Sequence, residues 1–160
     1  MQSRVYSRAS SILMMVAVLM LALFGLTGCW SDVDMTIGTE SDDAMAMIFY
    51  NSTGKDIDAV SVSESGDDSA EPESLEFDHS SWEYGMKSRI YCDPSDAGYD
   101  IELTYEDGET ATLHDVTFSE SDTVVVSIDE DTGITYMSYN DENEETIYTL
   151  DAEKAIEAAE

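Results

Sequence analysis

The sequence is poor in basic side chains. Its 160 residues include 6 lysines and arginines against 36 aspartates and glutamates, which gives a formal net charge of −30 at pH 7. A nucleic-acid-binding surface needs basic side chains to neutralise phosphates, so we expect no nucleic-acid partner. The same charge would repel an anionic bilayer, so any membrane attachment must come from another feature of the chain. Solubility in crowded or salty surroundings accounts for such a composition.

Cysteine and histidine are equally scarce. The chain has two cysteines, Cys29 and Cys92, and two histidines, His79 and His114. A Cys–His pair would need a cysteine with a lowered pKa, and no helix start precedes Cys92 to lower it. We therefore interpret Cys92 as a buried strand residue. Paired carboxylates occur throughout this acidic chain and indicate no particular site. We expect no enzyme, no catalytic residue and no cofactor.

An apolar run near the N-terminus stands out from the acidic remainder. Arg4 and Arg8 precede an uninterrupted apolar stretch over residues 12–24. A basic start followed by a short apolar core is typical of a secretory signal. The run is short for a membrane-spanning helix, which needs about 20 apolar residues.

Leu26-Thr27-Gly28-Cys29 follows this run directly. These four residues resemble the lipobox of bacterial lipoproteins. The resemblance implies that Leu26, Thr27 and Gly28 are recognised by a signal peptidase, which cleaves after Gly28. It further implies that Cys29 receives a diacylglyceryl group carrying fatty acyl chains such as palmitate. The alternative is an uncleaved anchor in which Cys29 occurs by chance.

The lipobox resemblance predicts both location and domain organisation. Two or more acyl chains hold a protein stably on a bilayer, so we expect the chain at the cell membrane on its extracytoplasmic side. A lipidated Cys29 leaves Cys92 without a disulfide partner. We expect a signal peptide over 1–28, a lipidated cysteine and flexible tether over 29–43, a β domain over 44–140 and an acidic extension over 141–160. Within that extension we expect a strand and a short helix capped by Asp151.

Short strand patterns separated by turn residues fill the domain. The clearest is residues 99–105, where apolar and polar side chains alternate strictly. Asp107-Gly108 predicts a two-residue primed turn into a partner strand with a phase break at residues 114–115. Residues 44–50 and 57–62 flank a turn signal, which predicts a second hairpin with a bulge at Asp58-Ala59. Further strands are expected over residues 86–92, 123–128 and 134–139.

About seven short strands and no long helix predict an all-β, antiparallel β-sandwich. The order Asn-x-Thr-Gly-x-x-Ile, from Asn51 to Ile57, then Tyr-Asp-Ile-x-Leu from Tyr99 and then Asp-Gly resembles small immunoglobulin-like domains of exported bacterial proteins. The resemblance covers residues 45–139 and implies the fold alone.

Two groups of residues are candidate binding sites. Trp82 and Tyr84 lie beside Lys87 and Arg89, and they form either an exposed patch for a protein or glycan partner or an aromatic plug at one end of the sandwich. The acidic run 129–133 superficially resembles a calcium loop, but its glycine comes one position early and no bidentate glutamate follows. We interpret it as a hairpin turn.

These observations predict a membrane-anchored, surface-exposed lipoprotein that acts as a non-enzymatic interaction or structural module. The alternative is a lipoprotein that binds Ca²⁺ or a small ligand through one of its acidic loops.

Overall fold

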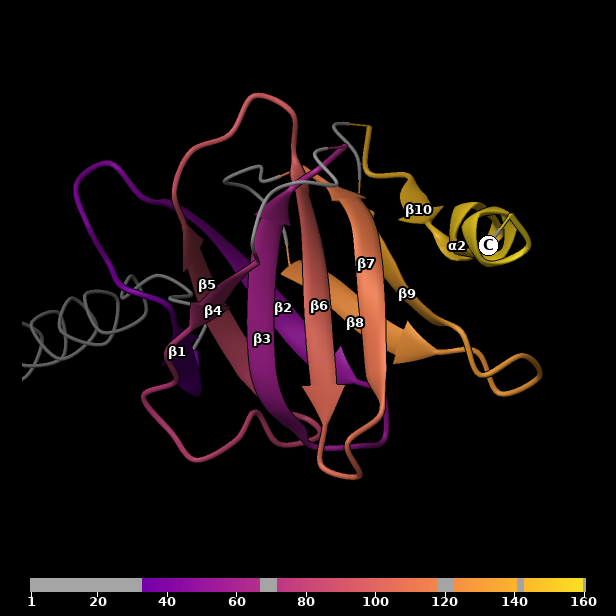
Figure 1. Ribbon diagram of the computed structural model, residues 1–160, viewed down its shortest axis with the longest axis horizontal. Coiled ribbons are helices and arrows are strands. Elements are labelled where there is room, and N and C mark those ends of the chain that lie inside the picture. The colour runs from indigo at the N-terminus through magenta and orange to yellow at the C-terminus, as the bar shows by residue number, and fades with distance from the viewer. Residues whose placement is uncertain (1–32, 67–71, 118–122, 141–142, 160) are drawn as a thin grey trace, which may run out of the picture. The chain divides into compact units, whose positions relative to one another are not determined.

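The computed structural model describes residues 33–66, 72–117, 123–140 and 143–159. The expected signal peptide and Cys29 lie outside these residues. These described residues form ten strands in two sheets and one short helix (Figure 1). None of the described helical segments has the length and apolarity needed to span a bilayer. The prediction of a mostly β, two-sheet domain is confirmed.

Six strands form the larger sheet. In spatial order they are β1 (Met35–Ile37), β5 (Lys87–Cys92), β2 (Met45–Ser52), β8 (Thr123–Ile128), β9 (Thr135–Asn140) and β10 (Thr146–Tyr148). Four strands form the smaller sheet, in the order β4 (Glu73–Leu75), β3 (Ile57–Glu64), β6 (Tyr99–Tyr105) and β7 (Thr110–Val116). Figure 1 shows the smaller sheet in front of the larger, with the strands of the two sheets crossing at an angle.

The prediction of a fully antiparallel sandwich of about seven strands is wrong for the larger sheet. β1 pairs with β5 in parallel, and β2 pairs with β8 in parallel. The predicted hairpin of residues 44–62 is also wrong, because β2 and β3 belong to different sheets. The turn between them carries the chain from one sheet to the other. A local turn signal cannot distinguish these outcomes, since the strand partners come from distant parts of the chain.

The predicted irregularities within strands are confirmed. The register between β3 and β6 shifts between Ile57 and Ala59, which places Ile57, Val60 and Val62 together in the core. A second shift occurs between β6 and β7, where Asp115 adopts a positive φ of 55°.

The β6–β7 turn differs from the primed turn that we predicted. The N–H of Gly108 donates to the carbonyl of Tyr105 (2.9 Å), and the N–H of Tyr105 donates to the carbonyl of Glu109 (2.9 Å). Gly108 has φ 83°, whereas Glu106 and Asp107 keep negative φ. A primed turn of type I′ needs positive φ at both central residues, so this is a three-residue loop with its glycine in the left-handed region.

The fold extends beyond both ends of the predicted β domain, 44–140. The expected tether, 29–43, contains β1, whose Met35 and Ile37 are buried, so residues 35–37 are part of the fold. At the C-terminus, the short helix predicted within 141–160 is present as α2 (Leu150–Glu157). Its N-cap is Thr149, without a side-chain capping bond, and Asp151 lies in the first turn.

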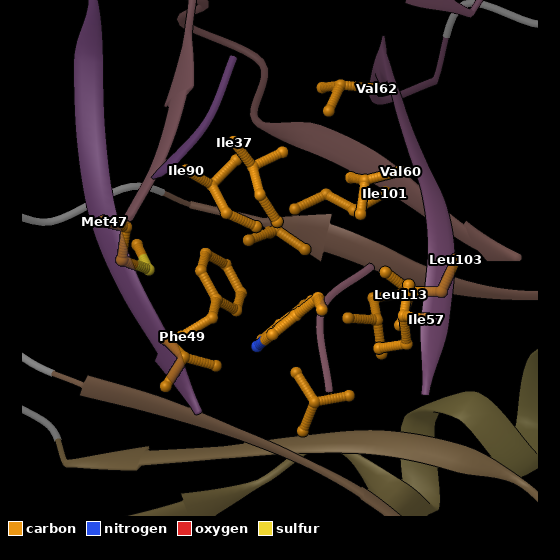
Figure 2. Packing of buried hydrophobic residues seen from close by; sticks show 14 of the residues in the cluster. Ile37, Met47, Phe49, Ile57, Val60, Val62, Ile90, Ile101, Leu103 and Leu113 are labelled. Carbon is orange, nitrogen blue, oxygen red and sulfur yellow. The ribbon is translucent and has the colours of Figure 1, made fainter. Parts of the chain in front are cut away.

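The core fills the space between the two sheets. Figure 2 shows side chains of the larger sheet facing those of the smaller one across this space. The larger sheet contributes Ile37, Met47, Phe49 and Ile90, and the smaller sheet contributes Val60, Ile101, Leu103 and Leu113. The alternation predicted for residues 99–105 is confirmed, because all four of its apolar side chains are buried.

Candidate functional site

Trp82 belongs to the core and not to an exposed patch. Its relative exposure is 0%, and its ring meets that of Phe49 edge-on, with 6.4 Å between ring centroids. The indole N–H donates to the carbonyl of Met86 (3.0 Å), while its backbone N–H and carbonyl pair with Ile57. A side chain with no exposed surface cannot contact a partner in the folded protein. Its position fits the alternative of an aromatic plug.

The Asn51 side chain links the β2–β3 turn to the backbone of Trp82. This fully buried amide donates to the carbonyls of Lys55 (2.9 Å) and Trp82 (3.0 Å), and its oxygen accepts from the backbone and hydroxyl of Thr53. A buried amide is costly unless it is hydrogen-bonded, and here both ends of the amide have partners. The sequence marked Asn51 only as a turn residue, and nothing in it indicated this contact with Trp82.

The other three predicted contact residues reach the surface, at different places. Tyr84 is 58% exposed, and its backbone N–H donates to the Asp56 carboxylate (2.8 Å). Lys87 and Arg89 lie on β5 and alternate with the buried Ser88, so both project from the outer face of the larger sheet. The backbone N–H of Lys87 donates to the Asp34 carboxylate (2.7 Å).

Lys55 forms ion pairs with two acidic side chains of the β6–β7 turn. The ammonium of Lys55 contacts the carboxylates of Asp107 (2.7 Å) and Glu109 (2.6 Å), and it lies 5.1 Å from the centroid of the Tyr105 ring. The hydrogen bond to Asp107 has the largest effect, and together with the bond to Glu109 it raises the pKa of Lys55 above its usual range. The arrangement ties the β2–β3 turn to the β6–β7 turn and leaves Lys55 occupied by its own chain.

Cys92 is an inert thiol in this fold. It is 7% exposed, and burial together with the nearby carboxylates of Glu73 and Asp93 raises its pKa to about 12. The thiolate, which is the nucleophile, is therefore negligible at neutral pH. None of the described contacts pairs Cys92 with a histidine: His79 contacts the Asp78 carboxylate (2.8 Å), and His114 contacts that of Glu153 (2.7 Å).

Glu153 of α2 is a buried carboxylate that sequence reasoning missed. Its exposure is 4%, and it accepts hydrogen bonds from the backbone N–H (3.2 Å) and the ring of His114. These bonds attach α2 to β7. A hollow of about 210 Å³ lies beside them, lined in part by Thr112, Ile134 and Ile156. No helical periodicity in so short a segment indicated that an acidic side chain would face inward.

The acidic run 129–133 forms a turn. The hydroxyl of Thr132 donates to the Asp129 carboxylate (2.5 Å) and lowers its pKa, and the N–H of Gly133 donates to the Asp129 carbonyl (2.7 Å). Lys154 of α2 lies 3.5 Å from the same carboxylate. Across the described residues, no group of three or more histidine, cysteine, aspartate or glutamate side chains converges as metal ligands would. The calcium alternative therefore gains no support from these residues.

A hollow of about 400 Å³ between β4 and β5 falls within the size range of ligand sites, which are about 300–1,000 Å³ and mostly apolar. Its lining includes Glu73, Glu76 and Asp93, together with Ser74 and Leu75. Acidic walls without a basic side chain among them do not suit an anionic ligand, and the carboxylates do not converge on a cation position.

Comparisons with known proteins indicate no function for this domain. No family model matches the chain, and no curated protein matches it. A protein from Eubacterium rectale, whose structure was determined by NMR, is similar with a TM-score of 0.40 and 14% identity, over 62% of this chain and 91% of that one. A likeness of this level carries no argument about function.

Proposed function

We propose that this protein is a lipid-anchored bacterial lipoprotein whose folded domain is a non-enzymatic interaction or structural module on the extracytoplasmic side of the cell membrane. One observation carries the proposal: Leu26-Thr27-Gly28-Cys29 directly follows the basic start and apolar run of a secretory signal. The fold is compatible with it, because the folded domain that the structure describes starts at Val33, soon after Cys29 in the sequence.

The described residues support the non-enzymatic part of the proposal by what their reactive groups already do. Burial keeps Cys92 protonated, and both histidines are engaged by carboxylates. The basic group of Lys55 is bound by two acidic side chains of its own chain. Burial of Cys92 and the ion pairs of His79, His114 and Lys55 therefore give these four side chains a structural role.

The finer features of the fold and of its contacts belong to the same proposal. We infer an immunoglobulin-like sandwich in the broad sense of two packed sheets, although the parallel β1–β5 and β2–β8 pairs depart from the pattern that we expected. The partner would be a protein or glycan outside the cell, and Tyr84, Lys87 and Arg89 remain candidate contacts because they reach the surface.

Metabolic labelling with a fatty-acid analogue tests the anchor. We expect the wild-type protein to incorporate the label and Cys29→Ala to lose it completely. Cys92→Ala is the matched control, because it removes the chain's other cysteine and should leave labelling unchanged. Labelling of Cys29→Ala at the wild-type level would contradict the proposal.

A further inference from the structure

The two sheets differ sharply in charge. The strands of the larger sheet contain no aspartate or glutamate, although 36 of the 160 residues are acidic. The strands of the smaller sheet contain six: Asp58, Glu64, Glu73, Asp100, Glu102 and Asp115. Lys87 and Arg89, half of the basic residues that follow Cys29, lie in the larger sheet. We name the outward side of its strands the acid-free face.

The strand register shows which side chains share this face. Lys87 is opposite Tyr50, Tyr50 is opposite Val125, Val125 is opposite Ser138, and Ser138 is opposite Tyr148. Side chains of directly paired residues project on the same side of a sheet, so these five form one row across it. Tyr148 is 64% exposed, whereas Tyr50 and Val125 are partly exposed. The row combines one basic, two aromatic and two small side chains.

A second row runs parallel to the first. Arg89 is opposite Ile48 on β2 and opposite Thr36 on β1. The acid-free face therefore presents two basic groups, tyrosines and aliphatic side chains on one surface. Tyrosine favours the headgroup level of a bilayer, and lysine and arginine attract anionic lipids.

The chain enters the fold at the edge of this sheet. Val33 is the first described residue, and β1, which follows it, is the edge strand beside β5. The N–H of Asp34 donates to the carbonyl of Lys87 (2.8 Å). Three residues lie between Cys29 and Val33, so the Cα atoms of these two residues are at most about 14 Å apart. An acyl anchor on Cys29 would therefore hold this edge of the larger sheet close to the bilayer.

We propose that the acid-free face lies against the anionic surface of the membrane, with the acidic outer face of the smaller sheet turned away. This inference rests on the proposed lipidation of Cys29, which supplies the attachment. It assigns Lys87 and Arg89 to lipid headgroups, which leaves Tyr84 as the candidate contact for a partner outside the cell. The charge difference supplies the orientation: Lys87 and Arg89 are attracted to anionic headgroups, while Asp100 and Glu102 are repelled. Each basic side chain near such a surface favours this orientation by about fivefold.

Depth-dependent quenching in vesicles tests the orientation. The full-length acylated protein would be reconstituted in vesicles containing anionic phosphatidylglycerol, and in vesicles of phosphatidylcholine alone. A fluorophore would be placed by Ser138→Cys on the acid-free face or by the matched Ser61→Cys on the outer face of the smaller sheet. Cys92 contributes little background because its thiol is buried and protonated.

We expect headgroup-attached quenchers to quench the Ser138→Cys label more than the Ser61→Cys label, and more strongly with phosphatidylglycerol present. The added variants Lys87→Gln and Arg89→Gln should each weaken this preference about fivefold. Equal quenching at both positions, or stronger quenching at Ser61→Cys, overturns the orientation when mass spectrometry shows an acylated Cys29. The orientation is also overturned if the Ser138→Cys label is shielded from quenchers to an extent that increases with protein density and does not depend on lipid charge. That result would indicate that the acid-free face contacts a second copy of the protein. An unacylated Cys29 overturns the proposed function instead.

Discussion

The two roles considered for Trp82 predict opposite effects of Trp82→Ala. A tryptophan side chain buries about 150–250 Å². At about 25 cal/mol per Å² this corresponds to about 4–6 kcal/mol of transfer free energy. Large-to-small substitutions of buried aromatics cost about 3–5 kcal/mol in practice. Because Trp82 is fully buried and contacts Phe49, we expect a loss of about 4 kcal/mol in the free energy of unfolding. Such a loss is a large part of the 5–15 kcal/mol that is typical of domains.

A milder substitution keeps the measurement possible if Trp82→Ala does not fold. Trp82→Phe removes the indole N–H, but the Met86 carbonyl keeps a second hydrogen bond from the N–H of Asn51 (3.1 Å). The expected cost is therefore about 1–2 kcal/mol, mainly for the smaller ring. Tyr84→Ala is the control, and we expect it to stay within about 0.5 kcal/mol because the side chain is exposed.

Urea unfolding followed by circular dichroism measures these differences. The urea concentration at the unfolding midpoint should be highest for Tyr84→Ala, lower for Trp82→Phe and lowest for Trp82→Ala. The dependence of the unfolding free energy on urea concentration should be similar for all three variants. A Trp82→Ala protein that loses less than about 1 kcal/mol would refute the interpretation of Trp82 as a structural plug.

Three further predictions concern buried groups and a close backbone approach. The Ser88 hydroxyl is buried and has no hydrogen-bond partner among the described residues, so Ser88→Ala should leave the melting temperature unchanged or raise it. Thr135→Val removes the hydrogen-bond partner of the Tyr105 hydroxyl, which lies 2.8 Å away, and should lower stability by about 1–3 kcal/mol. The reverse order of the two variants would contradict this reasoning. Gly38→Ala should destabilise clearly more than Gly54→Ala in thermal melts, because both have positive φ but only at Gly38 would the new Cβ overlap a neighbouring carbonyl oxygen; equal losses would count against it. Cys92 should react with thiol reagents only on unfolding, and since its folded pKa of about 12 exceeds its ordinary value of 9.0, stability should fall as pH rises above about 9; rapid labelling of the native protein would exclude a buried thiol.

Local features of the fold were predictable from the sequence because their causes are local. Alternation over residues 99–105 identified the inward face of β6, and the phase break at Asp58-Ala59 identified a bulge. The partners of β2 were not predictable, because its alternating pattern is satisfied equally by either neighbouring sheet. Its parallel partner β8 lies more than 70 residues later in the chain. Only the packed structure distinguishes a hairpin from a crossover here.

The candidate site shows the same division. Residue types alone identified Trp82, Tyr84, Lys87 and Arg89 as a group, but burial separates Trp82 from the other three. The acid-free face could not be predicted from the sequence, because its strands are separated by acidic loops along the chain. The strand order brings them together, and the contrast between the sheets appears only then.

The mass of the N-terminal peptide tests the central claim most directly. Arg8 is the last basic residue before Cys29, and Lys55 is the first after it. Trypsin digestion of protein extracted from its own cell membranes should therefore release a peptide of residues 29–55 that begins at Cys29 and carries a diacylglyceryl group. Recovery of residues 9–55 as one unmodified peptide would contradict the account.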